Sequence, residues 1–131
     1  MRGISERNVE IVRTAFEAYM RGDLDEALSY ADPEIIWNPV EEAPGEGPDA
    51  MRANLARWES NWDEYEAIPE EFMEAGERVV VTTRFRGTGK GSGLEVEARL
   101  YEVFTLRNGK VVRMDEFTER SEALEAAGLR Q

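Results

Sequence analysis

The order of helical and strand-like segments predicts an α+β fold, in which N-terminal helices pack on the concave face of a curled antiparallel sheet. Apolar residues recur at helical spacing near the N-terminus, whereas the C-terminal half holds long runs that alternate apolar and polar residues. Asn108-Gly109 separates two of these runs and is a strong signal for a tight β-hairpin. A parallel nucleotide-binding fold would instead alternate strands and helices throughout. At 131 residues, the chain has the size of one domain, which we expect to span 1–131.

Three helices are expected in the first half of the chain. The first ends before Gly22, and its apolar face carries Val9, Val12, Phe16, Tyr19 and Met20. Asp23 is placed to cap a short second helix. Pro48 suits the first position of a third helix, with Met51, Leu55, Trp58 and Trp62 on one side.

Five strand-like runs account for most of the remaining sequence. A short run at 35–37 is followed by a loop at 40–48, which is rich in Pro, Gly and Glu. Longer runs lie at about 65–75, 78–86, 94–106 and 111–118. The last predicted element is a short helix at 121–127, which Gly128 ends. The strands therefore follow the main helices, as expected for an α+β fold.

Composition excludes several classes of function. The net charge of −12 disfavours binding to nucleic acid or to an anionic membrane, because both need clustered Lys and Arg. The chain has no Cys and no His, which removes thiolate nucleophiles, imidazole bases and the usual ligands of zinc. We therefore expect no metal and no cofactor. The N-terminus lacks the apolar segment of a signal peptide, and no apolar run is long enough to span a membrane, so we expect a cytoplasmic protein.

Several local strings, in this order and spacing, resemble the SnoaL-like branch of the nuclear-transport-factor-2-like superfamily. The strings are FEAYMRGDLD at 16–25, YADPEIIW at 30–37, GPDAM at 47–51, NGKVV at 108–112 and EALEAAGL at 122–129. The superfamily includes ketosteroid isomerase, limonene-epoxide hydrolase and polyketide cyclases. The resemblance implies a cone-shaped sheet with a pocket between sheet and helices. It also implies a homodimer, formed through the outer sheet face that carries Glu95, Glu97, Arg99, Tyr101, Val103 and Thr105.

The resemblance also suggests catalytic residues. Asn38 falls where ketosteroid isomerase has its base, so a true ketosteroid isomerase is not expected, and Glu102 falls where that enzyme has its protonated acid. Compared with limonene-epoxide hydrolase, Asn38 resembles a water-holding amide, Arg84 an orienting residue and Asp115 the general base. SnoaL-type cyclases use an Asp in the same strand as Asp115. The candidate catalytic residues are therefore Asp115, Arg84, Glu102 and Asn38.

Strand alternation gives these candidates a location, and each has a structural alternative. If Phe117 faces the pocket, then Asp115 and Arg113 do so too, because alternate residues of a strand share a face. The alternative role for Asp115 is a structural ion pair with Arg that closes the interior of the sheet. Glu102 belongs to an apolar row with Leu100 and Phe104, where a carboxyl group is costly unless it is paired or neutral. Its alternative role is a cross-strand salt bridge to Arg84.

The remaining candidates are expected to bind substrate. Arg84 and Arg86 share one strand face and either cradle an anionic group or lie in solvent. The full predicted set of substrate-binding residues is Phe16, Tyr19, Trp37, Trp58, Arg86, Leu100, Phe104, Arg113 and Phe117. Together these residues indicate a cofactor-free acid–base enzyme (isomerase, cyclase or epoxide-hydrolase-like) acting on a small apolar or oxygenated molecule. The alternative is a non-catalytic domain for hydrophobic ligand binding or structural dimerisation.

Overall fold

The computed structural model describes residues 3–40 and 42–129. Within them, four helices accompany a six-stranded sheet with the order β2-β1-β6-β5-β4-β3. The helices are α1 (Ile4–Met20), α2 (Leu24–Ser29), α3 (Pro48–Glu59) and α4 (Arg120–Ala126). The strands are β1 (Ala31–Asn38), β2 (Gly45–Glu46), β3 (Trp62–Ala75), β4 (Arg78–Gly89), β5 (Glu95–Arg107) and β6 (Lys110–Phe117). The α+β order predicted from the sequence is confirmed.

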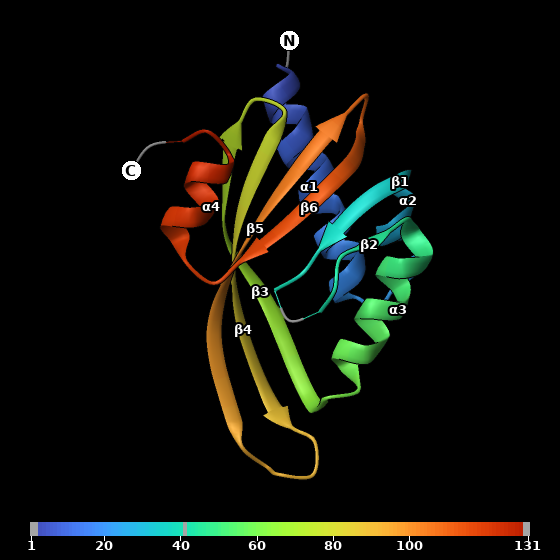
Figure 1. Ribbon diagram of the computed structural model, residues 1–131, viewed down its shortest axis with the longest axis vertical. Helices are drawn as coiled ribbons and strands as arrows, with labels where there is room; N and C mark the ends of the chain where they lie inside the picture. The colour runs from blue at the N-terminus through green and yellow to red at the C-terminus, as the bar shows by residue number, and fades with distance from the viewer. Residues whose placement is uncertain (1–2, 41, 130–131) are drawn as a thin grey trace.

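The sheet is mixed rather than wholly antiparallel. Strands β3 to β6 form an antiparallel meander, as predicted, whereas β1 pairs with β6 in parallel. In the loop predicted at 40–48, the short β2 adds an antiparallel partner to β1. Figure 1 shows the long β4–β5 hairpin projecting beyond α3 at the lower end of the molecule.

Local signals set the ends of several elements. The Asp23 carboxylate accepts a hydrogen bond from the Glu26 N–H at 3.1 Å, and so caps α2. Pro48 begins α3, where its missing N–H costs nothing. Asn108 and Gly109 have φ of 53° and 77°, the left-handed conformation that a tight turn between β5 and β6 requires.

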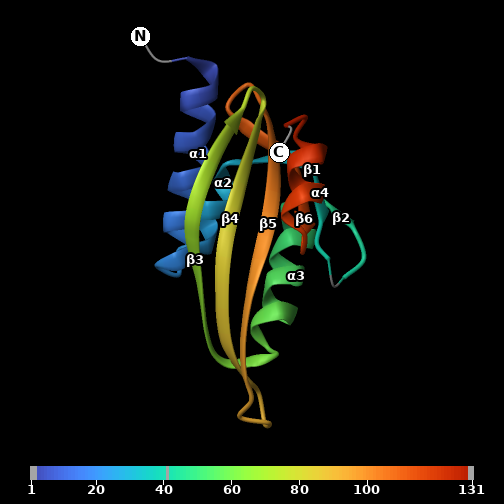
Figure 2. The same ribbon diagram turned by 90° about the vertical axis from the view of Figure 1, so that its left-hand side faces the viewer.

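The helices cover the two faces of the sheet unequally. Helix α1 packs against β3 and β4 on the inner, concave face, and α3 contacts β1 and β3. The short α4 contacts β5 and β6, and in Figure 2 it lies on the opposite side of the strands from α1. The inner face is therefore the one enclosed by the three N-terminal helices.

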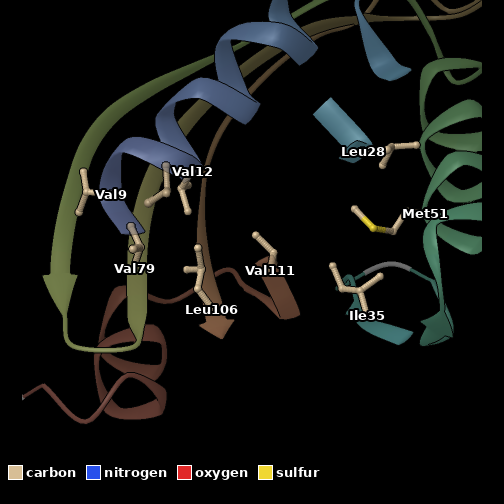
Figure 3. Close-up of a cluster of buried hydrophobic side chains, with 9 residues drawn as sticks. Val9, Val12, Leu28, Ile35, Met51, Val79, Leu106 and Val111 are labelled. Carbon is tan, nitrogen blue, oxygen red and sulfur yellow. The ribbon is translucent and has the colours of Figure 1, made fainter. Parts of the chain in front are cut away.

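Two apolar clusters hold these layers together. The larger lies inside, where side chains of all three N-terminal helices converge on the sheet (Figure 3); its buried members are Val9, Val12, Leu28, Ile35, Met51, Val79, Val81, Leu106 and Val111. The smaller joins α4 to the outer face through Val80, Val103, Ala123 and Ala127. Burial of this apolar surface is the main stabilising contribution to the fold.

A β-bulge in β6 decides which side chains face inward. Leu106 pairs with Val111, but the next residue back, Thr105, pairs with Arg113, so Val112 is left without an opposite residue. After a shift of one residue, every later side chain changes face. Met114 is consequently fully buried, whereas the Arg113 side chain is 47% exposed.

In the described part of the chain, none of the helices is long and apolar enough to cross a membrane.

Candidate functional site

A cavity of about 500 Å³ lies between the inner face of the sheet and helices α1, α2 and α3. A volume of this size suits a drug-sized organic molecule. Its aromatic walls come from helices α1 and α3 and from strands β1, β3, β4 and β5: Phe16, Tyr19, Trp37, Trp58, Trp62, Tyr65, Phe85 and Phe104. The polar groups that line it include Glu42, Asn54, Thr83, Glu102, Glu116 and Thr118.

Aromatic contacts make one end of the cavity rigid. The ring centres of Trp58 and Trp62 are 5.4 Å apart, and that of Phe85 lies 4.8 Å from Trp62. Near the middle, Phe16 packs edge-on against Phe104 at 6.0 Å. Such contacts contribute stability beyond the area they bury, and they fix the shape of the wall.

Glu102 is a titratable group within this apolar wall. It lies on β5 between Leu100 and Phe104, and the Thr83 hydroxyl donates a hydrogen bond to its Oε1 at 2.7 Å. Burial, and secondarily the negative charge of Glu116, raise the pKa of Glu102 to about 8, although the bond from Thr83 lowers it. At neutral pH Glu102 is therefore mainly a carboxylic acid, with one oxygen accepting from Thr83 and the other able to donate.

Glu116 is directly opposite Glu102 on β6 and also lines the cavity. Side chains opposite each other on adjacent strands have Cβ atoms roughly 5 Å apart. One Glu116 oxygen accepts a hydrogen bond from the Val40 N–H at 3.2 Å. The cavity thus holds two facing carboxyl groups, of which Glu102 is the one buried among apolar side chains.

Two tyrosines form a second polar feature. The hydroxyls of Tyr19 on α1 and Tyr65 on β3 are 2.5 Å apart, and Tyr65 donates to Glu59 Oε1 at 3.1 Å. Burial, and next the hydrogen bond to Tyr65, raise the pKa of Tyr19 well above its ordinary value. Tyr19 therefore keeps its hydroxyl hydrogen across the working pH range.

A third set of contacts fixes the segment beside the cavity mouth. Trp37 donates its indole N–H to Asn54 Oδ1 at 2.9 Å, and Asn54 in turn donates to Glu42. The other oxygen of Glu42 accepts from Arg57 at 2.5 Å. These bonds tie the segment that follows β1 to α3 and hold the indole of Trp37 in the cavity wall.

The sequence profile of the SnoaL-like domain matches residues 12–114, most of the chain. The protein belongs to the SnoaL-like family. Known structures agree: a nuclear-transport-factor-2-like protein of unknown function from Burkholderia pseudomallei is 25% identical, with a TM-score of 0.79 over 91% of this chain and 95% of that one. A candidate SnoaL-like polyketide cyclase from a Jannaschia species is 24% identical, with a TM-score of 0.81 over 100% and 98%.

TerC, which was co-crystallised with polyporic acid, has the same fold at 22% identity. Its TM-score is 0.78, over 93% of this chain and 98% of TerC. No curated protein matches the chain significantly. The comparisons therefore establish the family and the ketosteroid isomerase-like fold.

Seven of the predicted site residues line the cavity of this SnoaL-like protein: Phe16, Tyr19, Trp37, Trp58, Leu100, Glu102 and Phe104. They come from α1, β1, α3 and β5, and the sheet brings them together on its inner face. All three tryptophans of the chain are in this cavity wall, including Trp62. Helical and strand periodicity placed these residues because each belongs to an otherwise apolar face.

Asp115, Asn38 and Arg113 lie elsewhere, on the outer face of the sheet. Asn38 Nδ2 donates to Asp115 Oδ1 at 3.1 Å, and Arg113 Nε donates to Asp115 Oδ2 at 2.8 Å. The predicted inward orientation of Asp115 rested on Phe117 facing the pocket, and that premise is wrong. Phe117 packs with the outer cluster beneath α4, since the bulge at Val112 reverses the alternation.

Arg84 and Arg86 also point away from the cavity. They alternate on β4 with Val81, Thr83 and Phe85, which face inward. On the outer face, Arg84 lies 3.9 Å from Glu97 and Arg86 lies 3.9 Å from Glu66. The alternative Arg84–Glu102 salt bridge is also wrong, because the two side chains are on opposite faces.

The cavity residues that were not predicted from the sequence include Thr83, Glu116, Tyr65 and Phe85. Thr83 belongs to the alternating row that includes Val79, Val81 and Phe85, so its inward orientation was detectable from the sequence. Glu116 carries no such signal, because its orientation depends on the bulge. Among residues 3–40 and 42–129, no group of three or more acidic side chains is arranged to hold a metal ion.

Proposed function

We propose that this SnoaL-like protein is a cofactor-independent acid–base enzyme, which transfers protons on an apolar, oxygenated small molecule. The observation that carries the proposal is the Glu102–Glu116 pair, two carboxyl groups facing each other in one aromatic cavity. The environment of Glu102 favours its neutral form, which makes it the acid, and leaves Glu116 as the base. Carboxyl groups whose environments differ in this way divide acid and base roles between them.

The step follows from these roles. A ketone binds with its carbonyl oxygen at Glu102 and an adjacent C–H at Glu116. The Glu116 carboxylate takes the proton, the C–H electron pair becomes a C=C bond, and the carbonyl oxygen receives the proton of Glu102. The product is an enol, with Glu102 now ionised and Glu116 protonated. If the substrate has a C=C bond next to the reacting carbon, Glu116 returns its proton to the far carbon of the conjugated enol, the C=C bonds shift, the carbonyl re-forms and the enol O–H proton returns to Glu102, which completes an isomerisation.

The same pair supports two related reactions. Attack of the enol carbon on a second carbonyl group of the substrate closes a ring, which is the reaction class suggested by the relatives described as polyketide cyclases. Proton donation by Glu102 to an epoxide oxygen, with Glu116 activating water, opens an epoxide. Because Glu102 must hold its proton, each reaction is expected to fail above about pH 8.

Deuterium exchange tests the proposal. The protein is incubated in D₂O with 1-tetralone, a fused aromatic ketone, and exchange at the carbon beside the carbonyl is followed by NMR. We expect Glu102→Gln and Glu116→Gln each to slow exchange by at least ~100-fold. The matched control is Glu97→Gln, an outward-facing Glu on the same strand with a 58% exposed side chain. Exchange that is unaffected by both cavity substitutions would refute the assignment.

Ligand binding is measured in the same samples by quenching of the three cavity tryptophans. Tight binding with no exchange would instead support the second function, a hydrophobic ligand-binding protein, which the eight aromatic side chains of the cavity favour.

We further propose that the protein forms a homodimer through the outer sheet face. Glu95, Glu97 and Arg99 on this face are exposed and carry charges of both signs. These groups have partners within the chain, since Arg99 Nε lies 2.8 Å from Glu70 Oε1. Sedimentation at low and high salt tests the proposal, and a monomer at every concentration would contradict it.

A further inference from the structure

The direction of the hydrogen bonds through Tyr19 determines what the cavity can recognise. A tyrosine hydroxyl has one hydrogen to donate, and a carboxylate can only accept. Glu59 is exposed on α3, so Tyr65 donates its only hydrogen to the Glu59 carboxylate, at 3.1 Å. In the 2.5 Å contact between the tyrosines, Tyr19 must then be the donor and Tyr65 the acceptor. The chain of bonds runs Tyr19 to Tyr65 to Glu59.

This direction leaves Tyr19 as an acceptor on the cavity side. Its hydrogen is directed at Tyr65, so the lone pairs of its oxygen are the part available to a ligand. Glu102 has the opposite polarity, since its Oε1 accepts from Thr83 and its proton is on the other oxygen. Tyr19 and Glu102 both line the cavity, and the negative charge that Glu102 carries once it is ionised is the last among the causes that raise the pKa of Tyr19.

We propose that Tyr19 is a specificity-determining acceptor, held in that role by Tyr65 and Glu59, and that the cavity selects neutral ligands carrying both a ketone and a hydroxyl group. The ketone oxygen accepts from Glu102, and the hydroxyl donates to Tyr19. A ligand whose hydroxyl is methylated leaves a buried acceptor without a partner. The inference rests on the proposed function only in using the same cavity and the same acid.

Matched ligand pairs test this selectivity by binding alone. The probes are 5-, 6- and 7-hydroxy-1-tetralone and their methyl ethers, with Kd measured by tryptophan quenching at about pH 6. We expect the best hydroxy compound to bind about tenfold or more tightly than its ether, the effect of one unpaired buried polar group. In Tyr65→Phe, the Tyr19 hydrogen is free to turn toward the ligand, and the ratio is expected to fall to within about threefold.

Two further variants separate orientation from packing. Glu59→Ala, at an exposed position, lets Tyr65 reverse and donate to Tyr19, so it should lower the ratio in the same way. Glu59→Gln keeps an acceptor oxygen and should restore the ratio. The matched control is Tyr101→Phe, the same substitution on the outer face, which should leave it unchanged. Comparing one ligand pair across variants cancels the steric effect of the methyl group.

The outcomes are decisive in either direction. Three results would each overturn the inference. The first is a wild-type ratio of ether Kd to hydroxy-compound Kd below about threefold. The second is a ratio that is unchanged in both Tyr65→Phe and Glu59→Ala, and the third is no quenching by any tetralone. NMR of the ligand-free protein gives a further test. The wild type should show a slowly exchanging tyrosine hydroxyl resonance, and Tyr65→Phe should lack it. Absence of this resonance from the wild type would also overturn the inference. Selectivity without deuterium exchange would refute the proposed function alone, whereas exchange without selectivity would refute only this inference.

Discussion

Replacing Glu102 with Gln should stabilise the protein increasingly as the pH rises. Glutamine has nearly the shape of a protonated glutamic acid and keeps an oxygen that accepts from Thr83. The folded protein raises the pKa of Glu102 from the usual 4.5 to about 8, so between these values the folded state holds a proton that the unfolded chain has lost. Stability contributed by the neutral group is therefore complete below about pH 4.5 and is lost as the pH approaches 8.

The size of the effect follows from the same pKa shift. Each pKa unit corresponds to about 1.4 kcal/mol, so the full rise amounts to about 5 kcal/mol. Glu102 lines a cavity that water can enter, and water solvates part of the charge. We therefore expect the free energy of unfolding of Glu102→Gln, relative to that of the wild type, to increase by about 2 kcal/mol between pH 5 and pH 9. For a chain of this length that is roughly 6–10 °C in Tm.

Chemical denaturation of both proteins at several pH values provides the measurement. Other carboxyl groups titrate in both proteins and cancel in the difference, which isolates Glu102. The control is Glu97→Gln, an outward-facing substitution on β5, whose stability relative to the wild type should vary by less than about 0.5 kcal/mol over this pH range. A stability difference for Glu102→Gln that stays constant with pH would refute the claim that burial favours the neutral form.

Two further substitutions probe the cavity wall. Thr83→Val removes the hydroxyl that lowers the pKa of Glu102, so this pKa should rise further, as seen by NMR titration of the side-chain carboxyl carbon; a fall would contradict the role assigned to Thr83. Gly87→Ala places a methyl group 2.7 Å from the Trp62 ring and 2.8 Å from that of Phe85. We expect it to lower the free energy of unfolding by about 1–3 kcal/mol and to change the tryptophan emission. An unchanged Tm would show that the two aromatic rings can move aside without cost, which would contradict this prediction.

Much of the fold could be predicted from the sequence, because its signals are local. The apolar spacing of α1, the capping Asp23, the first-turn Pro48 and the Asn108-Gly109 turn each act within a few residues. The parallel pairing of β1 with β6 has no local signal, since it depends on how distant segments meet. Most of the cavity aromatics could be predicted because apolar periodicity reports burial, but it does not distinguish the core from the wall of a cavity.

The identity of the proposed catalytic pair depends on a feature that no local pattern predicts. A two-residue turn at Asn108-Gly109, with no bulge, would place Asp115 opposite Glu102 and turn Arg113 and Phe117 inward. Arg113 would then lie in the apolar interior, where an unpaired charge is costly. The bulge at Val112 gives up regular pairing at one residue and reverses the later alternation.

Several favourable placements follow from that single residue. Met114 fills the core, Arg113 stays half exposed beside Asp115, and Phe117 packs beneath α4. Glu116 then becomes the carboxyl group that faces Glu102 in the cavity. Whether Asp115 or Glu116 faces the cavity is therefore decided by the burial of Met114 and Phe117 and the exposure of Arg113, and residue types at catalytic spacing cannot reveal it.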